Sequence, residues 1–115
     1  MNVGIIGSGY VGLVAAACFA EMGNKVICVD VDERKITNLK EGKVPIYEPG
    51  IEPLVLDNQK KGTLLFTTNI KASLDEATIV FIAVGTPMGD DGSADLKYVL
   101  QVAEDIGNNM KEHII

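Results

Sequence analysis

The sequence predicts an α/β fold in which helices cover a doubly wound parallel sheet. Three observations support this prediction. Short apolar runs alternate with segments of helical periodicity along the 115 residues, as parallel βαβ units require. Glycine-rich stretches follow the first and the last of these runs. Hydrophobic residues make up 47% of the chain, which is enough for one domain with its own core.

The first unit begins with an apolar run at residues 2–6 and turns at Gly-Ser-Gly-Tyr-Val-Gly, residues 7–12. We predict a helix over residues 10–22, because small and apolar side chains dominate there and a glycine follows at Gly23. This helix is apolar on almost every side, which is typical of a helix packed closely on a sheet. The second strand is predicted over residues 26–29.

This turn and the second strand together predict a dinucleotide site of the Rossmann type. Gly7 permits the tight turn, Gly9 leaves room for a pyrophosphate beside the backbone, and Gly12 lets the helix pack closely. The N-terminus of the helix offers N–H groups and a partial positive charge to phosphates. Asp30 ends the second strand, where its carboxylate can accept hydrogen bonds from both ribose hydroxyls of NAD and repels a 2′-phosphate.

A second helix follows this acid. We expect Asp32 to be its N-cap, and Ile36 and Leu39 to form its buried face. Its first cations, Arg34 and Lys35, come too late to offer an evident site for a 2′-phosphate. NADP is therefore disfavoured rather than excluded.

A proline-rich segment at residues 45–50 separates this helix from a short helix predicted over residues 51–61. Each proline restricts its own backbone and that of the residue before it, so the segment is rigid. Such an elaborated connection favours a function, although a surface cover for the second helix explains it equally well. The third strand is predicted over residues 64–68, and a short helix or turn over residues 70–76.

The fourth strand is predicted over residues 77–84. Its continuous apolar side chains indicate a central strand buried on both faces. In the loop that follows, at residues 85–92, Gly85 allows close approach of a ligand, Thr86 can hydrogen-bond a cofactor, and Pro87 fixes the exit of the chain. An ordinary turn that carries a threonine is the alternative.

The last helix is predicted to begin at its cap, Asp95. Its inner stripe would consist of Leu96, Val99, Leu100, Ala103 and Ile106. A fifth strand begins as the chain ends, so we expect residues 1–115 to be one NAD-binding domain from a longer protein. Right-handed crossovers give the expected strand order 3-2-1-4, with the nucleotide at the carboxyl ends of strands 1 and 4.

The charge balance argues against nucleic acid and membrane partners. The net charge is −6, with acids and bases interspersed. The longest apolar stretch, at residues 11–20, is too short to span a bilayer, and there is no charged leader. Cys18 and Cys28 both fall at predicted core positions without the spacing of metal ligands, so we expect reduced thiols, no metal and a cytoplasmic protein.

The chain resembles the UDP-glucose/GDP-mannose dehydrogenase family over essentially its whole length. The residues that carry the resemblance are the glycine motif at 7–12 with Leu13, the strand end Val-Asp-Val-Asp at 29–32, Pro-Ile-Tyr-Glu-Pro-Gly at 45–50, and Val-Gly-Thr-Pro at 84–87 with Gly-Ser-Ala-Asp-Leu at 92–96. Many families share the glycine motif. The Tyr-Glu-Pro-Gly and Gly-Thr-Pro segments at these separations make the resemblance specific.

The resemblance implies a set of cofactor contacts. Gly9, Tyr10 and Val11 would present backbone N–H groups to the pyrophosphate of NAD. Asp30 would hold the adenosine ribose, and Lys35 would lie near the same ribose. Three residues would line the path toward the nicotinamide: Val84, Thr86 and Pro87.

The resemblance also implies the reaction. Members of the family oxidise the C6 alcohol of a nucleotide sugar, here UDP-glucose, to the carboxylate of UDP-glucuronate with two NAD, through a thiohemiacetal and a thioester on a cysteine. Neither Cys18 nor Cys28 matches that nucleophile, so the chain is expected to contribute no catalytic residue and to bind NAD without turnover. The full-length protein is expected to be a homodimer that takes the nucleotide sugar as its substrate.

Two other functions share the N-terminal fingerprint. One is a regulatory module that senses NAD without chemistry. The other is an NAD-dependent dehydrogenase of the 6-phosphogluconate or hydroxyacyl-CoA type. The segments at 45–50 and 85–87 argue against the first, which does not need them, and the second is expected to differ after the second strand.

Overall fold

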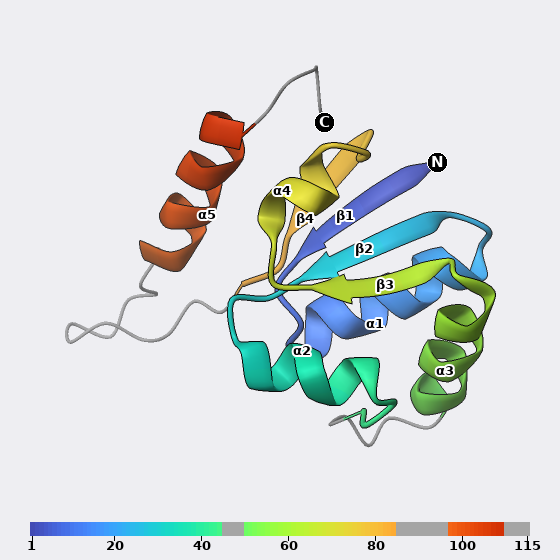
Figure 1. The fold of residues 1–115 in the computed structure, drawn as a ribbon. Helices are drawn as coiled ribbons and strands as arrows, with labels where there is room; N and C mark the ends of the chain where they lie inside the picture. The colour runs from blue at the N-terminus through green and yellow to red at the C-terminus, as the bar shows by residue number, and fades with distance from the viewer. Residues whose placement is uncertain (45–49, 85–96, 110–115) are drawn as a thin grey trace.

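The computed structural model describes residues 1–44, 50–84 and 97–109, and contains a four-stranded parallel sheet (Figure 1). Its strands are β1 (Asn2–Ile6), β2 (Lys25–Val29), β3 (Leu64–Thr67) and β4 (Ile79–Ile82). They lie in the order β3-β2-β1-β4, and every neighbouring pair is parallel, which confirms the predicted order. The carboxyl ends of all four strands therefore meet at one edge of the sheet.

Helices cover both faces of this sheet. They are α1 (Tyr10–Glu21), α2 (Glu33–Lys40), α3 (Ile51–Lys61), α4 (Ile70–Leu74) and α5 (Lys97–Asn109). Figure 1 shows α1, α2 and α3 on one side of the strands, and α4 and α5 on the other. Each side has its own apolar cluster, and the larger one lies under α1, α2 and α3.

Local chemistry explains where α2 begins and where α3 ends. The Asp32 carboxylate accepts hydrogen bonds from the backbone N–H groups of Arg34 at 3.0 Å and Lys35 at 3.3 Å, so it caps α2 as predicted. The bounds of α3 are those that the sequence predicts. Gly62 caps the end of this helix, with a φ of 80° that glycine adopts without strain.

The predicted burial of β4 is wrong. Phe81 is 38% exposed and Ile82 is 39% exposed. Within the described residues β4 pairs with β1 alone, so its other edge has no strand beside it. A continuous apolar run indicates that a strand can be buried, but its burial depends on segments that pack against it from elsewhere.

The predicted stripe of α5 is wrong in part. Leu100 is 66% exposed and Ala103 is exposed. Ile106 packs against the smaller apolar cluster as predicted, and so does Val102, which the prediction did not include. Two residues of the prediction lie outside the described residues: Asp95 and Leu96.

One face of α1 is buried against the sheet. Its buried residues are Gly12, Leu13, Ala16, Ala17 and Ala20. Cys18 lies on the other side of the helix and is exposed, so its predicted core position is wrong, whereas Cys28 on β2 is buried as predicted. Because α1 is apolar on nearly every side, the sequence does not indicate which of its faces meets the sheet.

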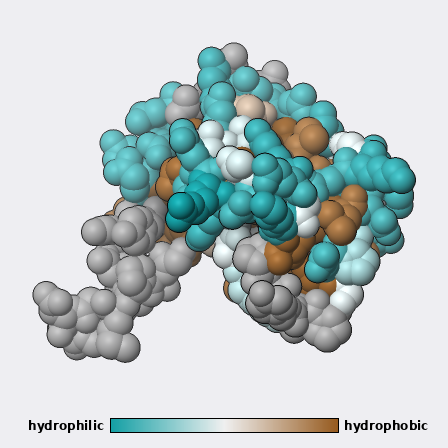
Figure 2. Space-filling model, turned by 60° about the horizontal axis from the view of Figure 1, so that its bottom comes forward, coloured by the Kyte–Doolittle hydropathy of each residue, from teal (hydrophilic) through white to brown (hydrophobic). Residues whose placement is uncertain are grey.

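The surface is polar over much of the face seen in Figure 2, with apolar side chains in separate patches between the hydrophilic ones. Among the helices described, none is long and apolar enough to cross a membrane.

Candidate nucleotide site

The turn between β1 and α1 is shaped by two glycines in close contact with backbone. Gly7 has a φ of 114°, which favours glycine, and its N–H donates a hydrogen bond of 2.6 Å to the carbonyl of Val29 on β2. A Cβ at Gly7 would collide with the backbone of Ala83, and a Cβ at Gly12 would collide with the carbonyl of Gly7. These glycines let the end of β1, the end of β4 and the first turn of α1 approach one another.

The middle glycine of the motif is different. A Cβ at Gly9 would meet no atom within 4 Å, and its φ of −73° is open to any residue. The fold therefore does not require glycine here, and the open space beside the backbone is what a phosphate group needs. The first hydrogen bond of α1 joins the N–H of Leu13 to the carbonyl of Gly9 at 2.9 Å. The backbone N–H groups of residues 10–12 therefore lie ahead of the regular hydrogen bonds of the helix.

The carboxylate of Asp30 lies against this turn. Its Oδ2 accepts a 3.0 Å hydrogen bond from the N–H of Ser8 and a 2.7 Å hydrogen bond from the hydroxyl of the same residue. Its Oδ1 accepts a 2.9 Å hydrogen bond from the N–H of Asp32. The acid and the glycine motif, predicted to form one site, are thus joined directly.

The environment of Asp30 keeps it ionised. Its partial burial by itself would raise the pKa of the carboxyl group. The hydrogen bonds from Asp32 and Ser8, together with the positive charge of Lys35, outweigh burial and hold the pKa of Asp30 below its ordinary value. At neutral pH this group is an acceptor for hydroxyl donors such as those of a ribose.

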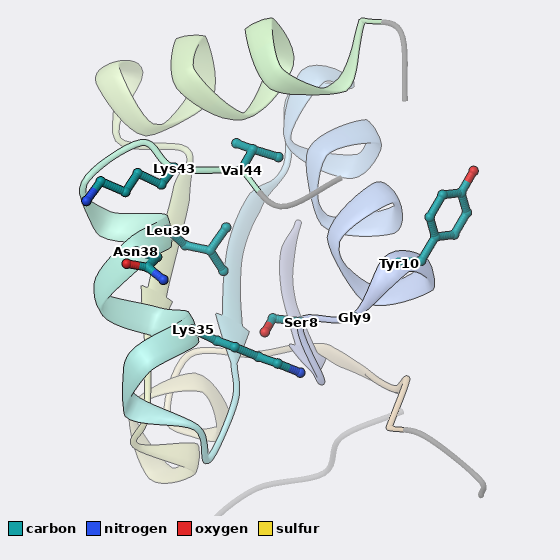
Figure 3. Close-up of a pocket in the computed structure, with 8 residues that line it drawn as sticks. All are labelled: Ser8, Gly9, Tyr10, Lys35, Asn38, Leu39, Lys43 and Val44. Atoms are coloured by element: carbon teal, nitrogen blue, oxygen red, sulfur yellow. The ribbon is translucent and has the colours of Figure 1, made fainter. Parts of the chain in front are cut away.

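A pocket of about 310 Å³ opens between the start of α1 and helix α2 (Figure 3). Its lining consists of Ser8, Gly9, Tyr10, Lys35, Asn38, Leu39, Lys43 and Val44. In Figure 3 the side chain of Lys35 reaches toward Ser8, whereas the ring of Tyr10 turns away. The ammonium of Lys43 pairs with Glu41 at 3.2 Å. Because its side chain reaches toward Ser8 (Figure 3), Lys35 brings a positive charge to the edge of the turn.

The buried thiol of Cys28 lies behind the turn. Its Sγ is 3.6 Å from the carbonyl oxygen of Gly7. Burial, and to a smaller extent the charge of Asp30, raises the pKa of Cys28 to about 12. The thiol is thus protonated at neutral pH and unsuited to be a nucleophile. In the described parts of the chain, no three His, Cys, Asp or Glu side chains are grouped so that they could hold a metal ion.

Most of the predicted cofactor-binding residues gather around the β1–α1 turn. They are Gly7, Gly9, Tyr10, Val11, Gly12, Asp30 and Lys35. Val84 follows β4, and its backbone nitrogen lies 3.1 Å from the place that a Cβ on Gly7 would take. Thr86 and Pro87 lie outside the described residues.

Sequence reasoning did not assign five of the lining residues to the site: Ser8, Asn38, Leu39, Lys43 and Val44. Ser8 occupies a variable position of the glycine motif, where nothing in the pattern marks a side chain that meets the acid. Asn38 could have been found, since it lies one helical turn after Lys35 and therefore on the same side of α2. No pattern indicates Val44, which follows the helix.

Comparison with known proteins identifies the family. The model of the UDP-glucose/GDP-mannose dehydrogenase family, NAD binding domain, matches residues 1–115. The chain is 51% identical over 115 residues to UDP-glucose 6-dehydrogenase of Pseudomonas aeruginosa. The alignment covers 100% of this chain and 25% of that protein. It is 51% identical over 109 residues to UDP-glucose 6-dehydrogenase TuaD of Bacillus subtilis, with 95% of this chain and 24% of that protein covered.

A solved structure agrees with this assignment. The crystal structure of a ternary complex of GDP-mannose dehydrogenase from Pseudomonas aeruginosa matches with a TM-score of 0.89 and 42% identity, over 93% of this chain and 24% of that one. The chain thus spans about a quarter of the length of these relatives. The family match over residues 1–115 favours this family over those of the two alternative functions. The chain belongs to the UDP-glucose/GDP-mannose dehydrogenase family and corresponds to the NAD-binding domain of its members.

Proposed function

We propose that this chain is the cofactor domain of an enzyme that oxidises UDP-glucose to UDP-glucuronate. Relatives named UDP-glucose 6-dehydrogenase reach 51% identity, whereas a GDP-mannose 6-dehydrogenase of Pseudomonas aeruginosa reaches 41%. Conversion of a primary alcohol to a carboxylate removes four electrons. Since NAD accepts one hydride, which carries two electrons, each turnover would consume two NAD.

The observation that carries the proposal is the contact between Asp30 and the glycine turn. The carboxylate is ionised, anchored by Ser8 and Asp32, and close to the open space beside Gly9. An adenosine ribose on Asp30 would bring the diphosphate of NAD to that space. Backbone N–H groups at the start of α1 would bind its oxygens, and Lys35 would lie near the ribose.

We propose the following residues of this chain as the cofactor contacts: Gly7, Gly9, Tyr10, Val11, Gly12, Asp30, Lys35, Val84, Thr86 and Pro87. None of them is proposed to take part in the chemical step. The thiol of Cys28 is protonated and buried, and Cys18 is exposed on α1 away from the buried face of that helix. We therefore expect residues 1–115 alone to bind NAD without oxidising UDP-glucose, and the whole protein to act as a homodimer.

Binding of NAD and NADP, measured by calorimetry on the whole protein and on Asp30→Ala, tests the proposed site. We expect the wild type to favour NAD, because the Asp30 carboxylate repels a 2′-phosphate. Hydrogen bonds to a charged group contribute roughly 1.5–3 kcal/mol, so Asp30→Ala should weaken NAD binding about 10- to 100-fold and reduce the preference for NAD over NADP.

The matched control is Asp57→Ala, which removes the same charge from an exposed position on α3. It should leave the affinities for both cofactors unchanged. Equal, weak binding of NAD and NADP that Asp30→Ala does not alter would contradict the ribose assignment. The sugar is tested separately, by comparing the rates of NADH formation with UDP-glucose and with GDP-mannose as substrates.

A further inference from the structure

Ser8 contacts Asp30, the acid of the proposed nucleotide site, twice, although it stands at a variable position of the glycine motif. Its side chain is almost fully buried, with 3% of the residue exposed. Both its hydroxyl, at 2.7 Å, and its backbone N–H, at 3.0 Å, donate to the same oxygen, Oδ2 of Asp30. One residue of the turn thus holds a carboxylate that lies 22 positions further along the chain.

These contacts limit what Asp30 can still accept. A carboxylate offers about four acceptor positions on its two oxygens. Three are taken by the two donors of Ser8 and the N–H of Asp32. About one position is then left open to a ligand hydroxyl while Ser8 and Asp32 hold the carboxylate.

We propose that Ser8 is a positioning residue, whose hydroxyl holds the Asp30 carboxylate where it can accept a hydrogen bond from the ribose of the cofactor. This inference rests on the proposed NAD site. Holding the carboxylate before the cofactor arrives reduces the ordering that binding requires. It also couples the phosphate-binding turn to the ribose-binding acid, because Ser8 belongs to the turn.

Several charged or titratable groups of the described residues face Asp30 or lie close to it. Lys35 approaches from α2 and favours the ionised form, and Asp32 follows in the loop before α2. Cys28 on β2 stays protonated, and the ring of Tyr10 on α1 turns away from the pocket. Since the Ser8 hydroxyl is among the donors that outweigh burial, its removal should raise the pKa of Asp30.

The first experiment needs no cofactor. The carboxyl carbon of Asp30 is titrated by NMR in the whole protein with labelled aspartate, and Asp30→Asn identifies its signal. We expect Ser8→Ala to move the titration to higher pH and Ser8→Thr, which keeps a hydroxyl, to restore it toward the wild-type value. Ser8→Cys, with a weaker donor of similar size, should shift it in the same direction as Ser8→Ala and serves if the alanine variant does not fold.

Ser73→Ala is the matched control. Ser73 is also buried, and its hydroxyl donates to the carbonyl of Ile27 at 3.3 Å rather than to a carboxylate. This variant should lower the stability of the fold and leave the titration of Asp30 where it is. An unchanged titration in Ser8→Ala would overturn the inference.

The second experiment measures NAD affinity by calorimetry between pH 4 and 7. Ser8→Ala should weaken binding about 3- to 10-fold at pH 7, as loss of one hydrogen bond that supports a charged group predicts. The loss of affinity on acidification should begin at higher pH than in the wild type. In the Asp30→Ala background the same substitution should have no further effect, because the carboxylate that Ser8 holds is gone.

The results separate this inference from the proposed function. A wild type that does not bind NAD refutes the proposed function, while the NMR titration still decides whether Ser8 holds Asp30. If the wild type binds NAD, either of two results refutes the role of Ser8 alone. One is an NAD affinity that Ser8→Ala leaves unchanged, and the other is an equal loss of affinity from Ser8→Ala in the wild-type and Asp30→Ala backgrounds.

Discussion

Two neighbouring strands of the sheet, β1 and β4, differ in how completely they are covered. Ile6 on β1 and Ile82 on β4 are partners in the register and have the same side chain, yet Ile6 is 4% exposed and Ile82 is 39% exposed. β1 has a strand on each side, whereas β4 has one on a single side within the described residues. Coverage by neighbours, and not the apolar character of the residue, therefore decides the burial of these strands.

The same difference separates the two halves of the candidate site. The half at the ends of β1 and β2 is closed by hydrogen bonds among residues of the N-terminal 32 positions: Gly7 to Val29, and Ser8 and Asp32 to Asp30. The half at the end of β4 rests on the pairing of that strand with β1 and on the contact of Ala83 with Gly7. We infer that the first half is organised within the N-terminal 32 residues, and that the second half depends on segments further along the chain.

The largest expected effect tests the contrast between the two strands. Ile6→Ala should lower the free energy of unfolding by about 3–4 kcal/mol, because it removes a buried side chain from a packed cluster. Ile82→Ala should lower it by roughly 1 kcal/mol, since much of that side chain is already in water. Urea unfolding of both variants measures the difference, and equal losses would mean that β4 is covered in solution as fully as β1.

A second comparison concerns the glycine that joins the two halves. Gly7→Ala should destabilise the fold by about 2–3 kcal/mol, because alanine is strained at positive φ and its Cβ collides with the backbone of Ala83. Gly23→Ala is the matched control, since Gly23 also has positive φ, 99°, but open space around it. We expect it to lose about 1 kcal/mol, which is the strain alone. Similar losses in thermal or urea unfolding would contradict the importance of the Ala83 contact.

The smallest expected change in stability comes with a clear change in binding. Gly9→Ala should alter the free energy of unfolding by less than about 0.5 kcal/mol, because its Cβ meets no other atom and its φ is ordinary. The same methyl would occupy the space proposed for a phosphate, so NAD affinity should fall roughly 10-fold or more. Gly107→Ala on α5 also meets no atom and should leave NAD affinity unchanged. If Gly9→Ala bound NAD as tightly as the wild type, the diphosphate would have to lie elsewhere.

Features that follow from local hydrogen bonding or from general rules of chain topology could be predicted from the sequence. The cap at Asp32 and the bounds of α3 follow from local hydrogen bonding and from glycine, and the strand order follows from the right-handed crossover rule. The pairing of the glycine motif with Asp30 follows from the strand order, which brings the ends of β1 and β2 together.

Features that depend on distant residues could not be predicted. The exposure of Phe81 and Ile82 depends on what lies beyond the edge of β4, and that of Leu100 on how α5 lies against the sheet. The face that α1 turns to the sheet is equally undetermined, because nearly all its side chains are apolar. The contact of Ser8 with Asp30 needs the exact path of the turn, which a variable position in a motif does not reveal.

The opposite surroundings of the two thiols have a practical consequence. Cys18 is exposed, while Cys28 is buried with its pKa raised to about 12. A maleimide dye at neutral pH would label Cys18 in the native state and reach Cys28 only when the sheet opens. Within residues 1–115, Cys18 thus offers an attachment point for a fluorophore on α1, and the rate at which Cys28 is labelled measures how often the sheet opens.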